Sequence, residues 1–138
     1  MSVVKPNDIT IWNGDIAFIA KEKMNMLLRQ MPGYKIQIVG NHDLDRSGKL
    51  IDFEVNERHM CYALNVVDGD MEFQLLFTHY PTDNVPKNCV NIHGHIHQHR
   101  TPNYWNICTC VEQVNYTPVN LRSIIADSKK RLITRKLD

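Results

Sequence analysis

The pattern of hydrophobic and polar residues along this chain indicates two kinds of secondary structure, strands and helices. Short runs rich in Val, Ile, Thr and aromatic residues are bounded by Gly, Pro, Asn and Asp, which is typical of strands and of the turns between them. These runs predict strands at residues 8–12, 35–39, 58–67, 71–77, 89–92 and 105–114. Apolar residues at helical spacing predict helices at residues 17–31 and 121–128.

The two predicted helices carry clear signals at their ends. The first has an apolar stripe at i, i+3, i+4 and i+7, formed by Met24, Leu27, Leu28 and Met31, and it stops before Pro32-Gly33. Asn120 precedes the second helix and is its expected N-cap. The order strand–helix–strand over residues 8–39 favours parallel pairing, and Asp68-Gly69 between two apolar runs predicts a hairpin. We therefore predict a single α/β domain over residues 1–138.

Polar residues that can bind a metal follow four of the predicted strands. They are Asp15, then Asn41 with His42 and Asp43, then His79, then His95 with His97. Each group alone has an ordinary explanation, because Gly, Asn and Asp are common in turns and a single histidine is often part of a core. Their shared position at strand ends allows one face of a sheet to gather all of them. Carboxylate, amide oxygen and imidazole ligands suit Mn, Fe, Ni or Zn.

The order of these groups resembles that of the calcineurin-like metallophosphoesterase superfamily. The matching motifs are Gly14-Asp15, Gly40-Asn41-His42-Asp43, the isolated His79, and Gly94-His95-Ile96-His97. The resemblance covers essentially the whole chain and points to the small bacterial and phage-type phosphoesterases, whose tails carry a segment similar to residues 115–119. It implies an α/β fold in which a β-sandwich of two mixed sheets is flanked by helices, with metals at the strand ends.

The resemblance also implies a hydrolase that cleaves a phosphomonoester or a phosphodiester with a metal-activated hydroxide. Its cofactors would be two divalent transition ions. Asp15 would bridge both ions, His97 would bind the first, and the ligands of the second would be completed by Asn41, His79 and His95. His42 would be the general acid, and Asp43 would orient its ring.

One motif of the superfamily has no counterpart here. The family begins with a strand ending in Asp-x-His, which binds the first metal, and no such motif precedes Asp15. Relative to the family the chain is therefore N-terminally truncated, and one metal is expected in place of two. Three explanations stay open: a shortened product of a longer gene, a strand supplied by a second copy or another partner chain, or a degenerate member that serves as a protein-binding scaffold with at most one metal.

The composition narrows the class of protein. With 43% hydrophobic residues, 22% charged residues and a net charge of +1, the chain lacks the strong basic field of many nucleic-acid-binding proteins. No apolar run approaches the ~20 residues of a membrane helix. The four cysteines, Cys61, Cys89, Cys108 and Cys110, lack zinc-site spacing, so reduced thiols and a cytoplasmic location are expected. The basic residues between 129 and 136 are interpreted as a solvated helix face or tail.

Overall fold

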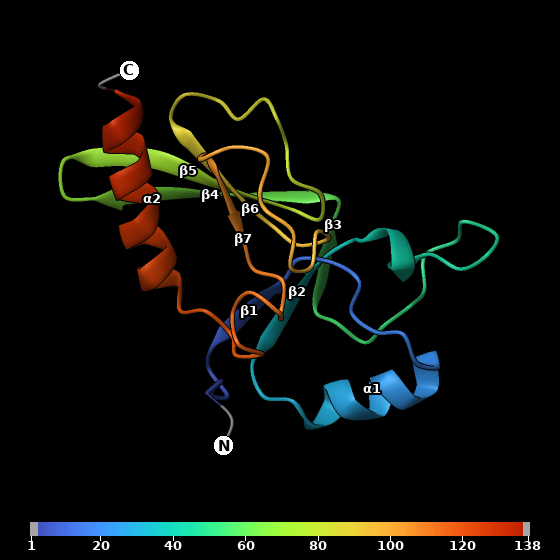
Figure 1. Ribbon diagram of the computed structural model, residues 1–138. Coiled ribbons are helices and arrows are strands. Elements are labelled where there is room, and N and C mark those ends of the chain that lie inside the picture. The colour runs from blue at the N-terminus through green and yellow to red at the C-terminus, as the bar shows by residue number, and fades with distance from the viewer. Residues whose placement is uncertain (1–2, 137–138) are drawn as a thin grey trace.

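The structure, a computed structural model, describes residues 3–136, and its N-terminal half forms a small parallel sheet (Figure 1). The strands are β1 (Ile9–Trp12), β2 (Tyr34–Ile38) and β3 (Glu57–His59), in the order β1-β2-β3. Helix α1 (Lys21–Gln30) connects β1 to β2, and these two strands are parallel. The predicted strand–helix–strand unit is therefore confirmed.

The C-terminal half forms a second sheet of four strands. They are β4 (Cys61–Asp68), β5 (Met71–Thr78), β6 (Cys89–His93) and β7 (Asn106–Cys108), in the order β4-β5-β6-β7. The predicted hairpin is confirmed, because β4 and β5 pair antiparallel up to Asp68 and Met71, and Gly69 in the turn has a φ of +63°. β6 and β7 continue this sheet in parallel. Residues 3–136 thus form an α/β protein with two sheets and two helices.

The strand boundaries differ from the prediction in two places. The single strand expected at 58–67 is broken at Met60, so that β3 pairs with β2 in the first sheet and β4 pairs with β5 in the second. The first sheet is consequently all parallel, and only the four-stranded sheet is mixed. The run at 105–114 contributes only β7, because residues 111–117 form turns in which Asn115 and Tyr116 have positive φ.

The larger hydrophobic cluster lies on one face of the four-stranded sheet. Alternate residues of β4, β5, β6 and β7 point into it, as the pleat of a strand requires, and the buried ones are Val66, Phe73, Leu75, Phe77, Val90, Ile92 and Ile107. Helix α2 (Leu121–Arg135) covers this face with Ile124 and Leu132, and Ile38 of β2 joins the same cluster. Burial of each such side chain stabilises the fold by ~1.5–3 kcal/mol.

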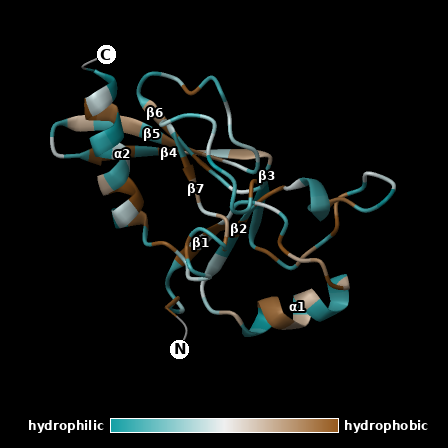
Figure 2. Ribbon diagram, in the orientation of Figure 1, coloured by the Kyte–Doolittle hydropathy of each residue, from teal (hydrophilic) through white to brown (hydrophobic). Residues whose placement is uncertain are grey.

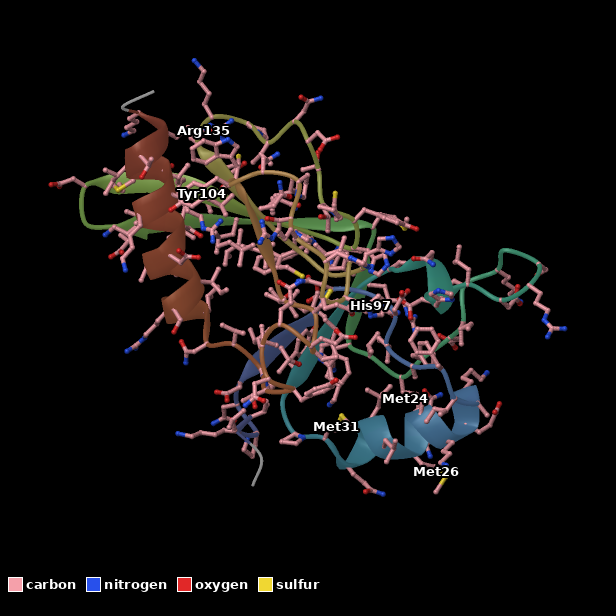
Figure 3. All side chains as sticks on the ribbon, in the orientation of Figure 1. Met24, Met26, Met31, His97, Tyr104 and Arg135 are labelled. Atoms are coloured by element: carbon pink, nitrogen blue, oxygen red, sulfur yellow. The ribbon has the colours of Figure 1, made fainter. Side chains whose placement is uncertain are left out.

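A smaller cluster holds α1 against the rest of the chain. Met24 and Leu28 of the predicted stripe are buried there beside Phe53, whereas Leu27 and Met31 are 39% and 37% exposed. Figure 3 shows Met24 on the side of α1 that faces the sheets and Met26 on the opposite side. Figure 2 shows brown, hydrophobic segments in α1 and in β7, and each of these elements contributes residues to one of the two clusters. No helix within residues 3–136 is long and apolar enough to span a membrane.

Both helices differ in length from their predictions. Helix α1 begins at Lys21, four residues after the predicted start, because residues 18 and 19 form a bend and Ala20 has a non-helical ψ of 139°. Helix α2 begins where expected, with the Asn120 side chain accepting a hydrogen bond from the Arg122 N–H, but it continues to Arg135. The extension adds the buried Leu132 to the larger cluster.

Candidate metal centre

Four strand ends bring the predicted metal ligands into one region. Asp15 follows β1, Asn41 opens a short 3-10 turn (Asn41–Asp43) after β2, and His79 and His95 follow β5 and β6. In each sheet the two contributing strands are parallel, so their carboxyl ends meet at one edge. Suitable side-chain atoms of Asp15, His79 and His95 all lie within 4.8 Å of one another.

Two glycines permit this close approach. A Cβ atom on Gly14 would lie 2.2 Å from His79 Nδ1, and Gly14 has a φ of +89°. A Cβ atom on Gly40 would lie 2.2 Å from Asp15 Oδ1. No side chain larger than hydrogen fits either position, because real Cβ atoms do not approach other heavy atoms so closely. The Gly-Asp and Gly-Asn-His-Asp motifs thus have a steric basis in this chain.

The backbone of three candidate ligands is strained. Asp15, His95 and His97 have φ values of +53°, +67° and +50°, in the left-handed region that costs a non-glycine residue ~1–2 kcal/mol. Such strain persists only where the surrounding contacts impose it, and it concentrates at functional sites. Here it aims two ligand side chains toward His79.

The buried ring of His79 defines the geometry of the centre. His79 Nδ1 lies 2.7 Å from the carbonyl oxygen of Asn13, so Nδ1 carries a proton and donates it to that oxygen. The other nitrogen of a neutral ring, Nε2, then presents a lone pair. It faces Asn41 Oδ1 at 2.9 Å, His95 Nδ1 at 3.2 Å and Asp15 Oδ2 at 3.4 Å.

This arrangement fits a divalent cation. A proton on Nε2 would satisfy one of the three facing atoms, whereas a metal ion can accept electron pairs from several of them together. The set contains two imidazole nitrogens, one carboxylate oxygen and one amide oxygen, a mixture suited to the Zn, Mn, Fe and Ni of the prediction. Burial and repulsion from His79 lower the pKa of His95, which favours the neutral ring that a metal requires.

Asp43 does not have the role expected from the sequence. Its Oδ2 accepts hydrogen bonds from the backbone N–H groups of Asp15 and Gly40, and its Oδ1 accepts one from Ile16. The residue is fully buried. Both oxygens are therefore engaged by backbone, and the expectation that Asp43 orients the His42 ring is wrong: Asp43 fixes the loops that carry Asp15 and Asn41.

His42 lies at the exposed rim of the centre. Its backbone N–H donates to Asp15 Oδ1 at 2.8 Å, which leaves the other carboxylate oxygen for His79 and the candidate cation. Its ring lies 5.0 Å from that of Phe18. Within residues 3–136 neither ring nitrogen of His42 has a hydrogen-bond partner. The imidazole is thus accessible to a ligand at the centre.

His97 is not brought into this group. It is exposed, and its Nδ1 lies 2.7 Å from Glu112 Oε1. Hydrogen bonding to His97 lowers the pKa of Glu112, so a carboxylate accepts from Nδ1, and Nε2 has no hydrogen-bond partner within residues 3–136. Figure 3 places His97 on the loop that follows β6. Sequence reasoning did not find Glu112, because nothing in its local pattern distinguishes it from an ordinary surface residue.

A second buried histidine lies next to the centre. His93, fully buried at the end of β6, donates from Nδ1 to the carbonyl oxygen of Gly94 at 2.8 Å. Its Nε2 has no hydrogen-bond partner within residues 3–136. Burial lowers the pKa of His93, which favours the neutral form of the ring.

Comparisons with known proteins give one similar structure. No model of a known protein family matches the chain, and no curated protein sequence matches it either. Its fold is similar to the crystal structure of a protein of unknown function from Aquifex aeolicus, with a TM-score of 0.62 and 25% sequence identity. The similarity covers 90% of this chain and 78% of the other. This supports the α/β architecture, and it assigns no activity.

Proposed function

We propose that this chain is a metal-dependent phosphoesterase whose divalent ion is held by Asp15, Asn41, His79 and His95. One observation carries the proposal: the buried His79 Nε2 faces an amide oxygen, a carboxylate oxygen and a second imidazole nitrogen at 2.9–3.4 Å. When bound, a divalent ion supplies positive charge that neutralises phosphoryl oxygens and makes water a stronger nucleophile. The order of motifs that resembles the calcineurin-like metallophosphoesterases supports the same chemistry.

The protein's own groups have distinct tasks in this proposal. Asp15 links the centre to His42, because one of its carboxylate oxygens accepts the His42 N–H and the other faces His79. The exposed His42 ring donates a proton to the oxygen of the departing alcohol. Asp43 holds the backbone of both loops so that the ligands and the proton donor keep their spacing.

A second metal position would involve His97. Glu112 leaves its Nε2 available, in the carboxylate–histidine arrangement that commonly orients a metal ligand. Only the group around His79 is assembled within the described residues, so we expect one ion and slow turnover from the chain alone. The same observation favours the second candidate function, a protein-binding scaffold with at most one metal.

Hydrolysis of aryl phosphates separates the two functions. We expect the full chain with Mn²⁺ to hydrolyse p-nitrophenyl phosphate or its bis ester, and a chelator to abolish the activity. His42→Ala is expected to lower the rate on an alkyl phosphate, whose leaving oxygen needs a proton, by about 10²–10⁴-fold, and to affect the p-nitrophenyl esters much less. His99→Ala, at an exposed histidine of the neighbouring loop, is the matched control and should retain the rate.

Two results would contradict the phosphoesterase. One is hydrolysis that the chelator does not affect. The other is retention of about one metal ion without any turnover of either ester, which would favour the scaffold.

A further inference from the structure

Two exposed aromatic side chains flank the candidate metal centre. Phe18 is 71% exposed, and its ring lies 5.0 Å from the ring of His42. Tyr80 is 50% exposed, and its ring lies 4.3 Å from that of His95 and 4.9 Å from that of His79. One aromatic ring thus contacts the proposed proton donor, and the other contacts two proposed ligands.

Phe18 has no evident structural task. It lies three residues after Asp15 in the segment between β1 and α1, and neither hydrophobic cluster contains it, although its neighbours Ile16 and Ala17 pack against the smaller one. A phenyl ring held largely in water does not benefit from the hydrophobic effect. Its only ring contact within residues 3–136 is His42, so its exposed face is available beside that residue.

The Tyr80 ring contacts two of the proposed ligands, and the residue is also partly exposed to solvent. Its ring meets His79 edge-on, at an interplanar angle of 79°, and tilts against His95 at 54°. Its hydroxyl group has no hydrogen-bond partner within the described residues, although buried tyrosines usually find one. The Tyr80 side chain is thus partly exposed beside the two proposed imidazole ligands.

We propose that the phosphoester bound at this centre carries a planar aromatic group on its leaving-group side, which stacks on Phe18 and borders Tyr80. The position of Phe18 carries the inference: its ring lies 5.0 Å from that of His42, so a leaving group that takes a proton from His42 lies within reach of Phe18. Aromatic rings stack on planar groups with any pattern of hydrogen-bonding atoms, so an aryl group and a nucleobase share the required chemistry. The inference rests on the proposed phosphoesterase function.

Equilibrium binding to the full, Mn²⁺-loaded chain tests it without relying on turnover. Calorimetry would compare phenyl phosphate, adenosine 5′-monophosphate and ribose 5-phosphate. We expect at least one of the two aromatic ligands to bind about tenfold or more tightly than ribose 5-phosphate. Phe18→Ala should remove most of this advantage and leave the affinity for ribose 5-phosphate unchanged. Phe18→Leu, which keeps the apolar surface without the ring, should behave like Phe18→Ala.

The control is Tyr116→Ala, which removes a 74% exposed ring from the turn region of residues 111–117 and should change nothing. An advantage for phenyl phosphate alone would assign an aryl ester, and one for the nucleotide would assign a nucleobase. If ribose 5-phosphate binds in a metal-dependent manner and neither aromatic ligand binds more tightly than it does, the stacking proposal is overturned. The proposed phosphoesterase function is then unaffected. If no phosphate ester binds, both fail.

Discussion

At the scale of single residues, Asp43 has the most contacts with the backbone of the centre. Its buried carboxylate accepts three backbone N–H groups from two loops. Asp43→Ala leaves these donors without their acceptor, and we expect it to lower the free energy of unfolding by about 3 kcal/mol or more. Urea unfolding followed by circular dichroism measures the change. Asp83→Ala, at an exposed aspartate, should lie within about 0.5 kcal/mol of wild type, and equal effects of the two changes would refute the structural role.

His93 makes stability depend on pH. Its folded-state pKa lies below the ordinary 6.5, so the unfolded chain binds more protons in acid than the folded chain does. The stability associated with its neutral ring is present above pH 6.5 and is lost as the pH falls through the lowered pKa. We expect the free energy of unfolding to decrease as the pH falls below about 6.5. His93→Gln should reduce this slope, and an unchanged slope would count against the assignment.

The positions of the proposed metal ligands could be predicted from the sequence. The contacts of the residues around them, such as Asp43, could not. Asp15, Asn41, His79 and His95 each follow a recognisable strand, and the ends of strands meet in space. The task of Asp43 depends on which backbone N–H groups lie near it in three dimensions. Phe18 and Tyr80 lie close to predicted site residues in the sequence, but their exposure and ring contacts appear only in the fold.

At the scale of elements, the basic side chains of α2 attach the helix to the sheet. Arg131 pairs with Asp127 and donates to the carbonyl oxygens of Tyr104 and Asn106. Arg135 lies over the Trp105 ring at 4.4 Å, and Figure 3 shows it reaching toward the loop that carries Tyr104. Lys129 pairs with Asp68 in the hairpin. The interpretation of this segment as a solvated face or tail is therefore wrong for these three residues.

This attachment has a measurable consequence. Arg131→Ala removes two hydrogen bonds to backbone carbonyls, an ion pair and the contact with the Tyr104 ring, and we expect a loss of about 1–3 kcal/mol in the free energy of unfolding. Lys130→Ala, one residue earlier on the same helix, is the matched control. Thermal unfolding of both variants gives the comparison. If Lys130→Ala lowers the free energy of unfolding as much as Arg131→Ala does, the positive charge of α2, and not the contacts of Arg131 with the sheet, accounts for the stability.

The break at Met60 illustrates the limit of pattern reasoning for elements. Residues 58–67 contain no Gly, Pro or Asp to mark a break, so the sequence predicts one strand. In the fold, Met60 is 75% exposed and the chain bends there, because β3 pairs with β2 in one sheet while β4 pairs with β5 in the other. Which sheet a strand joins depends on partners distant in the sequence, and local periodicity carries no information about them.

At the scale of the whole molecule, the two sheets contribute one pair of ligands each. Asp15 and Asn41 come from the parallel sheet, and His79 and His95 come from the mixed one. Ile38, which is fully buried, packs in the same cluster as residues of the second sheet and so holds the two sheets together close to the centre. The geometry of the site therefore depends on the docking of the sheets as well as on the motifs.

The most direct test of this account is the metal content of the purified chain after loading with Mn²⁺ or Zn²⁺ and removal of free ion. We expect about one ion per chain by elemental analysis. Asp15→Asn and His79→Gln should each lose most of it while circular dichroism shows a folded protein, and His99→Gln should keep it. Metal content at the level of the buffer in wild type, or full retention in both Asp15→Asn and His79→Gln, would contradict the central claim that these residues form a metal centre.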